Sequence, residues 1–211
     1  MPLSTPTDAS ELEPLKSIYL DDQFFSPSFA DYDPQPFPKW LEGIDTTFAP
    51  FLPTSIRRVH KALSLASLGP EDVLLDLGSG DGRFCVAAVR EFDARRAVGV
   101  ETEEWLVELS ENLAKRAFNG EDEVKLERVR FVLGDFTTPE LKDVVRDPET
   151  TCIVVFLSPE FSKEWEEFLV AHYEKGVKIV SMVFNLSELK ALRCSVCEDL
   201  DGIFVYEKLK A

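Results

Sequence analysis

Hydrophobic positions change their spacing along the chain, and the changes divide most of it into strands and helices. Short continuous apolar runs are typical of strands buried on both faces of a sheet. They predict strands near residues 72–77, 96–101, 129–134, 152–157, 177–184, 193–198 and 202–208. Apolar positions three and four residues apart predict helices near residues 54–68, 82–92, 103–118, 139–146 and 160–173.

Strands that alternate with helices predict an α/β fold with a doubly wound, Rossmann-like sheet. Only a short polar turn, Glu198 to Gly202, separates the last two predicted strands, which favours an antiparallel hairpin. The expected sheet therefore has seven strands, is mostly parallel, and ends in a C-terminal antiparallel hairpin strand. In an open sheet of this kind, ligands bind outside the carboxyl ends of the strands.

Residues 1–49 have a different pattern, in which prolines alternate with aromatic residues. The prolines forbid a long helix, whereas so many aromatic side chains argue against plain disorder. We expect an irregular but ordered N-terminal arm, with about its first 10 residues loose, packed onto a domain formed by residues 50–211. Thr54 or Ser55 is expected to cap the first helix of that domain.

The most informative motif follows the first predicted strand, where Asp76 precedes glycines at 78, 80 and 82. Glycine allows positive φ and lets a ligand approach the backbone closely. The helix that follows presents free N–H groups at its N-terminus, which suit an anionic group. The predicted cofactor-binding residues here are Asp76, Gly78, Ser79, Gly80, Asp81 and Gly82.

The spacing of the glycines separates two cofactor classes. The nicotinamide dinucleotide fingerprint places its third glycine five residues after the first, where this chain has Arg83. Asp76 and Asp81 would also repel a pyrophosphate. They would attract a sulfonium and an ammonium group, so the motif favours S-adenosylmethionine. A glycine-rich turn without a ligand is the alternative.

Acidic residues also follow the second and third strands. Glu101 is placed to accept both ribose hydroxyls of an adenosine; an acid here would also interact favourably with the dipole of the next helix, and both roles are compatible. Asp135 could accept from the adenine amino group while Phe136 packs on the ring, although a capped turn would have the same sequence. Ser158, Pro159 and Glu160 follow the fourth strand and are expected near the reacting methyl group, or to begin a helix. No catalytic base can be named.

Cysteine spacing gives no metal site. Cys85 and Cys152 lie in apolar segments and are expected in the core. Cys194 and Cys197 form a single C-x-x-C without the second pair that zinc requires. In a regular strand these two side chains would also face opposite ways.

The net charge is −16, from 39 acidic and 23 basic side chains, so the positive surface that nucleic-acid binding requires is not expected. An acidic protein could attract a basic partner, or the charge could serve solubility alone. No apolar run approaches the roughly 18 residues of a membrane helix, and the N-terminus does not resemble a targeting signal. We therefore expect a cytoplasmic protein that does not insert into membranes.

Together, Asp76 to Gly82, Glu101 and Gly134-Asp135 resemble the seven-strand S-adenosylmethionine-dependent methyltransferases. Residues 50–55, Arg83 and Phe156-Leu157-Ser158-Pro159 are similar to one subgroup, the lysine methyltransferases of the ATP synthase c subunit and adenine nucleotide translocase. The resemblance, over roughly residues 50–210, implies that Asp76, Gly78 and Gly80 line the methionine end of the cofactor. It also implies that Glu101 contacts the ribose and Asp135 the adenine.

Three functions are compatible with these observations. The first is a protein-lysine N-methyltransferase whose acceptor lysine lies on a basic surface. The second is a small-molecule methyltransferase with an enclosed pocket covered by the aromatic arm. The third is a module that binds a cofactor or partner without catalysis, against which the intact acids and glycines argue.

Overall fold

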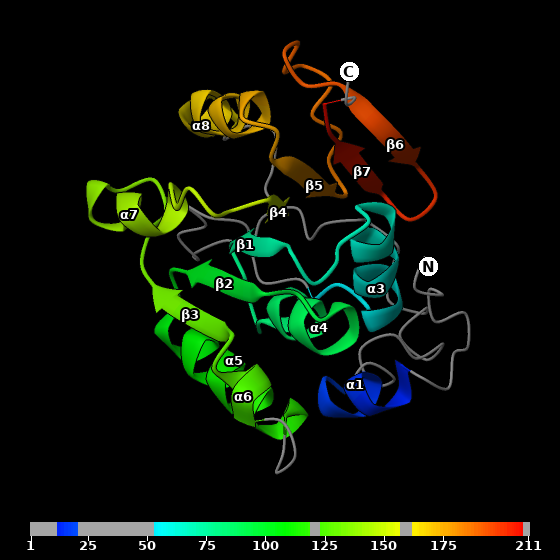
Figure 1. Ribbon diagram of the computed structural model, residues 1–211, viewed down its shortest axis with the longest axis vertical. Helices are drawn as coiled ribbons and strands as arrows, with labels where there is room; N and C mark the ends of the chain where they lie inside the picture. The colour runs from blue at the N-terminus through cyan, green and yellow to red at the C-terminus, as the bar shows by residue number, and fades with distance from the viewer. Residues whose placement is uncertain (1–11, 21–52, 119–122, 157–161, 209–211) are drawn as a thin grey trace, which may run out of the picture.

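The computed structural model describes residues 12–20, 53–118, 123–156 and 162–208. A seven-stranded sheet in the order β3-β2-β1-β4-β5-β7-β6 forms its centre (Figure 1). The strands are β1 (Val73–Leu77), β2 (Arg96–Glu101), β3 (Val129–Leu133), β4 (Cys152–Val155), β5 (Lys178–Met182), β6 (Cys194–Glu198) and β7 (Ile203–Tyr206). β7 runs antiparallel to both of its neighbours, and the other pairings are parallel, which confirms the predicted fold.

Helices cover both faces of the sheet. They are α1 (Glu13–Ile18), α3 (Ile56–Leu65), α4 (Arg83–Phe92), α5 (Glu104–Ala117), α6 (Glu123–Leu126), α7 (Lys142–Val145, after the 3-10 turn Pro139–Leu141) and α8 (Ser162–Glu174). Figure 1 shows α7 and α8 on the other side of the sheet from α4 and α5. One core cluster joins the sheet to α1, α3, α4 and α5, and a second joins the other face to α7 and α8. Successive strand residues alternate between the two clusters, as the pleat requires. None of the helices described is long and apolar enough to span a membrane.

The sequence analysis expects no helix within residues 1–49, but a short one, α1, forms there; its 6 residues are compatible with prolines that forbid only a long helix. Pro14 lies in the first turn of α1, where a helix tolerates proline since that N–H has no helical partner. Leu12, Leu15 and Tyr19 are buried in the same core cluster as α4 and α5. The part of the arm that the structure describes is therefore integrated into the domain core.

Ser55, one of the two caps expected for α3, accepts a hydrogen bond from the Arg58 N–H. Cys85 and Cys152 are buried, as expected. The expectation that the exposed side chains of Cys194 and Cys197 face opposite ways was wrong. A bulge between Cys194 and Val196 pairs the two cysteines with Tyr206 and Phe204, which are two residues apart, so both side chains lie on one face.

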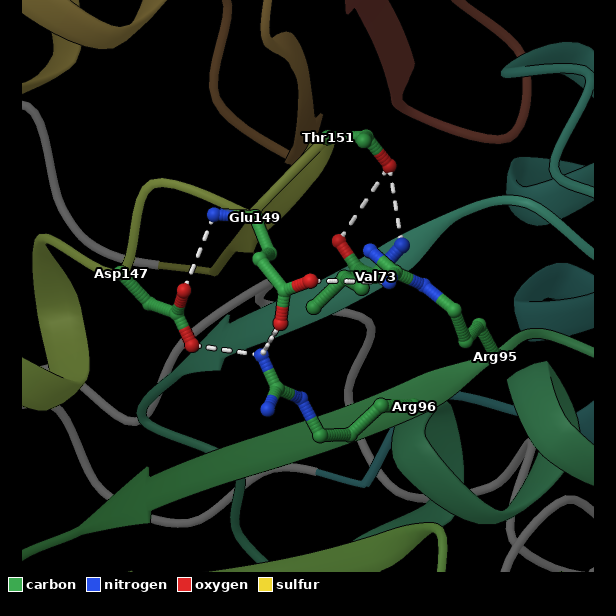
Figure 2. Close-up of polar contacts among 6 residues, drawn as sticks. All are labelled: Val73, Arg95, Arg96, Asp147, Glu149 and Thr151. Carbon is green, nitrogen blue, oxygen red and sulfur yellow. Dashed lines mark hydrogen bonds and ion pairs between the residues drawn. The ribbon is translucent and has the colours of Figure 1, made fainter.

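Ion pairs tie together the amino ends of the central strands (Figure 2). Arg96, at the start of β2, donates to Asp147 at 2.5 Å and Glu149 at 3.2 Å, and Arg95 donates to Glu149 at 2.8 Å. Thr151 exchanges hydrogen bonds with Val73 at the start of β1. The side chains at this edge are engaged with one another, whereas the predicted site residues lie at the opposite, carboxyl edge.

Candidate cofactor site

The loop between β1 and α4 folds back over the end of β2. Gly78, Gly80 and Gly82 have φ values of 78°, 55° and 77°, which side chains with a Cβ rarely adopt. The N–H groups of Gly78 and Ser79 both donate to the carbonyl of Val100, at 2.9 and 3.0 Å. The glycines thus allow the tight turn that the sequence predicted.

Gly99 in β2 has a packing role that the sequence analysis did not identify. A Cβ at this position would lie 2.6 Å from Ser79 Oγ and 2.7 Å from Ser79 Cβ. The glycine loop can lie against β2 only because Gly99 has no side chain. The available signal was a glycine inside a strand, which often marks a close backbone approach.

Glu101 joins this loop to the start of α5. Its Oε2 accepts from the Gly80 N–H at 2.9 Å, and its Oε1 accepts from the N–H groups of Thr102 and Glu103 at 2.7 and 3.1 Å. The carboxylate therefore orders the two residues that lead into α5. Among the described residues only the Gly80 N–H donates to Oε2, which leaves this oxygen a lone pair for a ligand hydroxyl.

Asp76 lies at the carboxyl end of β1 and is 3% exposed. Within the described part of the chain, its buried Oδ2 has no hydrogen-bond partner, and neither does the buried Ser79 Oγ. Burial, together with the charges of Glu101 and Asp81, raises the pKa of the Asp76 carboxyl to about 8. A cationic ligand beside Asp76 would reverse this effect and favour the carboxylate.

Asp81 lies in a different environment from the one its sequence position suggested. Arg83 donates through Nε to Asp81 Oδ1 at 2.8 Å and through Nη2 to Oδ2 at 2.5 Å, and both residues are buried. The remaining guanidinium nitrogen donates to the Thr54 carbonyl, and the Tyr19 ring lies 5.1 Å from the guanidinium carbon. Arg83 thus compensates the charge of Asp81 and joins the arm, the segment before α3 and the glycine loop.

Asp135 and Phe136 follow β3 at the same edge. Asp135 Oδ1 accepts from the N–H and hydroxyl of Thr137 at 2.8 and 2.7 Å, which closes a capped turn. Phe136 is half-buried and packs against the second core cluster. Ser158, Pro159 and Glu160 lie outside the described residues.

The comparisons with known proteins agree with this geometry. Residues 76–193 match the family model described as the ANTKMT methyltransferase domain. The chain belongs to this family. A protein-lysine N-methyltransferase of Saccharolobus islandicus is 28% identical over 65% of this chain and 78% of that protein. The mouse adenine nucleotide translocase lysine N-methyltransferase is 31% identical over 75% of this chain, which covers 62% of the mouse protein.

Among solved structures, an RNA methyltransferase from Salinibacter ruber in complex with S-adenosyl-L-homocysteine is similar, with a TM-score of 0.60 and 30% identity. The match covers 74% of this chain and 91% of that chain. The protein is an S-adenosylmethionine-dependent methyltransferase.

The described residues fit this cofactor. The unpartnered Asp76 Oδ2 and Ser79 Oγ lie at a loop of positive-φ glycines, which leaves the backbone open to close approach. The buried Asp76 carboxyl can gain an ion pair from a cationic group, which would lower its raised pKa, whereas a pyrophosphate offers it no such pair. Glu101 keeps an acceptor position for a hydroxyl at the neighbouring strand.

Proposed function

We propose that this protein is a protein-lysine N-methyltransferase. The observation that carries the proposal is the family match over residues 76–193, together with relatives from an archaeon and the mouse that are named as lysine methyltransferases. Because the chain spans about six tenths of the mouse relative, the acceptor protein is part of the proposal.

We assign the cofactor contacts by their position along the carboxyl edge. Asp76 and the loop formed by Gly78, Ser79, Gly80, Asp81 and Gly82 are proposed to hold the methionine end. Glu101 is proposed to accept from the ribose, and Asp135, with Phe136, to contact the adenine. The unpartnered oxygen of Asp76 and the remaining lone pair of Glu101 support the first two assignments. The third assignment rests on the position of Asp135 after β3, at the same edge of the sheet.

S-adenosylmethionine, when bound, supplies a methyl group activated by a positively charged sulfur. A lysine amine must lose its proton, from an unperturbed pKa of about 10.4, before its nitrogen can attack. Asp76 and Glu101 would hold the cofactor at the glycine loop and so offer this methyl group to the neutral amine, and the proton lost by the amine would pass to solvent. The protein's contribution to such an in-line displacement is alignment and exclusion of water.

The likeness to a solved RNA methyltransferase raises a second candidate, an RNA acceptor. The net charge of −16 argues against it, since RNA binding depends on neutralising phosphates with basic side chains. A basic protein surface would instead be attracted. A small-molecule acceptor is the remaining alternative. We also propose that the protein is cytoplasmic.

The test is to incubate the protein with methyl-labelled donor and a cell lysate, and then to separate protein, RNA and small molecules. We expect label on discrete protein bands, with acid hydrolysis releasing it as methyl-lysine. Label in the RNA fraction would support the second candidate and contradict the proposal. Label that stays in the small-molecule fraction would favour a small-molecule acceptor.

A further inference from the structure

The strand β5 ends in a strained turn that has no role in the cofactor site. Val183 has a φ of 66°, and the Phe184 N–H donates across it to the Met182 carbonyl at 2.8 Å. A hydrogen bond between residues two apart, with a positive φ at the centre, defines the rare and strained form of the γ-turn. Positive φ is especially unfavourable for a β-branched residue such as valine.

The surrounding structure holds this turn in place from two sides. The Val183 N–H donates to the Gly202 carbonyl at 2.6 Å, and Ser181 Oγ donates to the Phe184 carbonyl at 2.6 Å. Gly202 is so close that a Cβ there would lie 3.1 Å from Val183 Cα. The strained conformation is therefore fixed by contacts from β5 itself and from the β6–β7 turn.

Residues of α3 hold the β6–β7 turn in place. The Asp201 carbonyl accepts from Arg58 Nε at 2.9 Å, and the Asp201 carboxylate accepts from Arg57 at 2.9 Å and from Lys61 at 2.7 Å. These bonds hold the pKa of the Asp201 carboxyl below its usual value. Strain of this kind persists where neighbouring contacts over-determine it, and it concentrates at functional sites.

The consequence of the turn is the position of Phe184. Its ring lies beside that of Phe156, with centroids 6.3 Å apart and planes inclined by 51°. Phe156 directly follows β4, and the pairing of Val155 with Leu77 places it level with Gly78, the first glycine of the cofactor loop. Both rings are half-buried. They lie at the carboxyl edge, where ligands of open sheets bind.

We propose that Phe156 and Phe184 form the wall that holds the side chain of the acceptor lysine, and that the turn at Val183 aims Phe184 toward it. This inference rests on the proposed lysine methyltransferase function. Lysine carries a long apolar stem that packs well on aromatic rings, and ring faces attract its ammonium group before it loses its proton. Phenylalanine rings offer no hydrogen-bond donors or acceptors, so this wall would not recognise the polar edge of a nucleobase.

The first test uses Phe184→Ala and Phe156→Ala, with Phe92→Ala as the matched control. Phe92 is also half-buried against the first core cluster and lies 4.9 Å from the His60 ring, but it ends α4 at the opposite edge of the sheet. Each protein is titrated with lysate protein as the acceptor, and methyl-lysine is measured after hydrolysis. Affinity for S-adenosylmethionine is measured separately by calorimetry.

Both wall variants should need at least about tenfold more acceptor for half-maximal methylation, since each loses the burial of apolar surface. Their cofactor affinity should equal that of the wild type, and Phe92→Ala should match the wild type in both measurements. If Phe184→Ala needs no more acceptor than the wild type, the inference is overturned. Methyl-lysine formed by the wild type would in that case still support the proposed function. Absence of methyl-lysine from the wild type would overturn both.

The second test separates two effects of Val183: the fixed backbone turn that directs Phe184, and the packing of the valine side chain. Val183→Ala and Val183→Gly both remove the isopropyl group, but only glycine relieves the positive φ. Val183→Gly should melt at a higher temperature than Val183→Ala, yet need more acceptor for half-maximal methylation because the turn is no longer fixed. A lower melting temperature for Val183→Gly, or equal acceptor dependence of the two variants, would contradict an aiming role.

Discussion

Asp76 is a carboxyl group that the fold keeps protonated near neutral pH, because burial raises its pKa to about 8. Binding of a cation beside it should favour the ionised form and release a proton. We expect S-adenosylmethionine binding to release close to one proton, or about 0.9, at pH 7, and almost none at pH 9. Calorimetry in buffers of different ionisation enthalpy measures this number directly. Equal proton release at both pH values would contradict the assignment of Asp76 to the cationic end of the cofactor.

The same group should make the stability of the ligand-free protein depend on pH. The pKa of Asp76 is raised on folding, so its favourable contribution is complete below the unfolded pKa, near 4, and is lost as the pH rises through about 8. Asp76→Asn cannot ionise and should escape this loss. In urea unfolding, its midpoint relative to that of the wild type should therefore increase from pH 5 to pH 8. Parallel curves for the two proteins would show that Asp76 does not titrate in this range.

Glu101 is assigned to the ribose, and Glu101→Gln tests this with little change in shape. The amide retains one acceptor oxygen but loses the charge and half of the acceptor capacity. Hydrogen bonds to charged groups contribute roughly 1.5–3 kcal/mol, so cofactor affinity should fall about tenfold to a hundredfold. The alanine variant is less informative, because it would also release the N–H groups of Gly80 and Glu103.

Calorimetric titration with S-adenosylmethionine provides the measurement for Glu101→Gln. Glu104→Gln, an exposed change in the first turn of α5, is the matched control and should bind like the wild type. Equal affinity in folded Glu101→Gln would leave Glu101 with only its role at the start of α5.

The sequence predicted where the candidate site residues lie in the fold better than it predicted what surrounds their side chains. Asp76, Glu101 and Asp135 all lie at the carboxyl edge, because parallel strands end on the same side of a sheet. The engagement of Asp81 by Arg83 could not be predicted, since it depends on the Thr54 carbonyl and the Tyr19 ring, which are distant in sequence.

At the scale of elements, α1 connects the N-terminal arm to the glycine loop through Tyr19 and Arg83. Tyr19→Ala and Leu15→Ala should each lower the free energy of unfolding by about 2–5 kcal/mol, because both residues are buried. Only Tyr19→Ala should also weaken cofactor binding, since it removes the ring that positions the Arg83 guanidinium. Thermal unfolding and calorimetric titration of both variants make the comparison. An equal loss of cofactor affinity in both would mean that α1 acts by general packing.

Element boundaries were predicted best where the local pattern and the tertiary contacts agree. β2 begins and ends at the predicted residues, and α4 starts one residue later than expected. The apolar run 177–184 suggested a longer β5, but the strand stops at Met182 because Val183 has a φ of 66° and the Phe184 N–H donates back to the Met182 carbonyl. The Gly202 carbonyl that helps to hold this turn, by accepting from the Val183 N–H, comes from 19 residues further along the chain and leaves no mark in the local sequence.

At the scale of the whole molecule, the net charge of −16 should govern encounters with the acceptor. If the acceptor is a basic protein surface, salt should screen the attraction and lower the rate at limiting acceptor concentration. We expect the initial rate of protein methylation to fall steadily between 20 and 300 mM NaCl, roughly severalfold. Added RNA should compete little. A rate independent of salt would place the acceptor site outside the influence of the overall charge.

The bulge in β6 has a consequence for how copies of this protein meet. β6 is the last strand of the sheet, paired only with β7 in the described structure, so it presents backbone groups that a strand from another molecule could extend. The extra residue at the bulge breaks the regular spacing of those groups. A flat neighbouring strand cannot continue the ladder through such an irregular border. We therefore expect this irregularity to disfavour edge-to-edge pairing between copies of the protein.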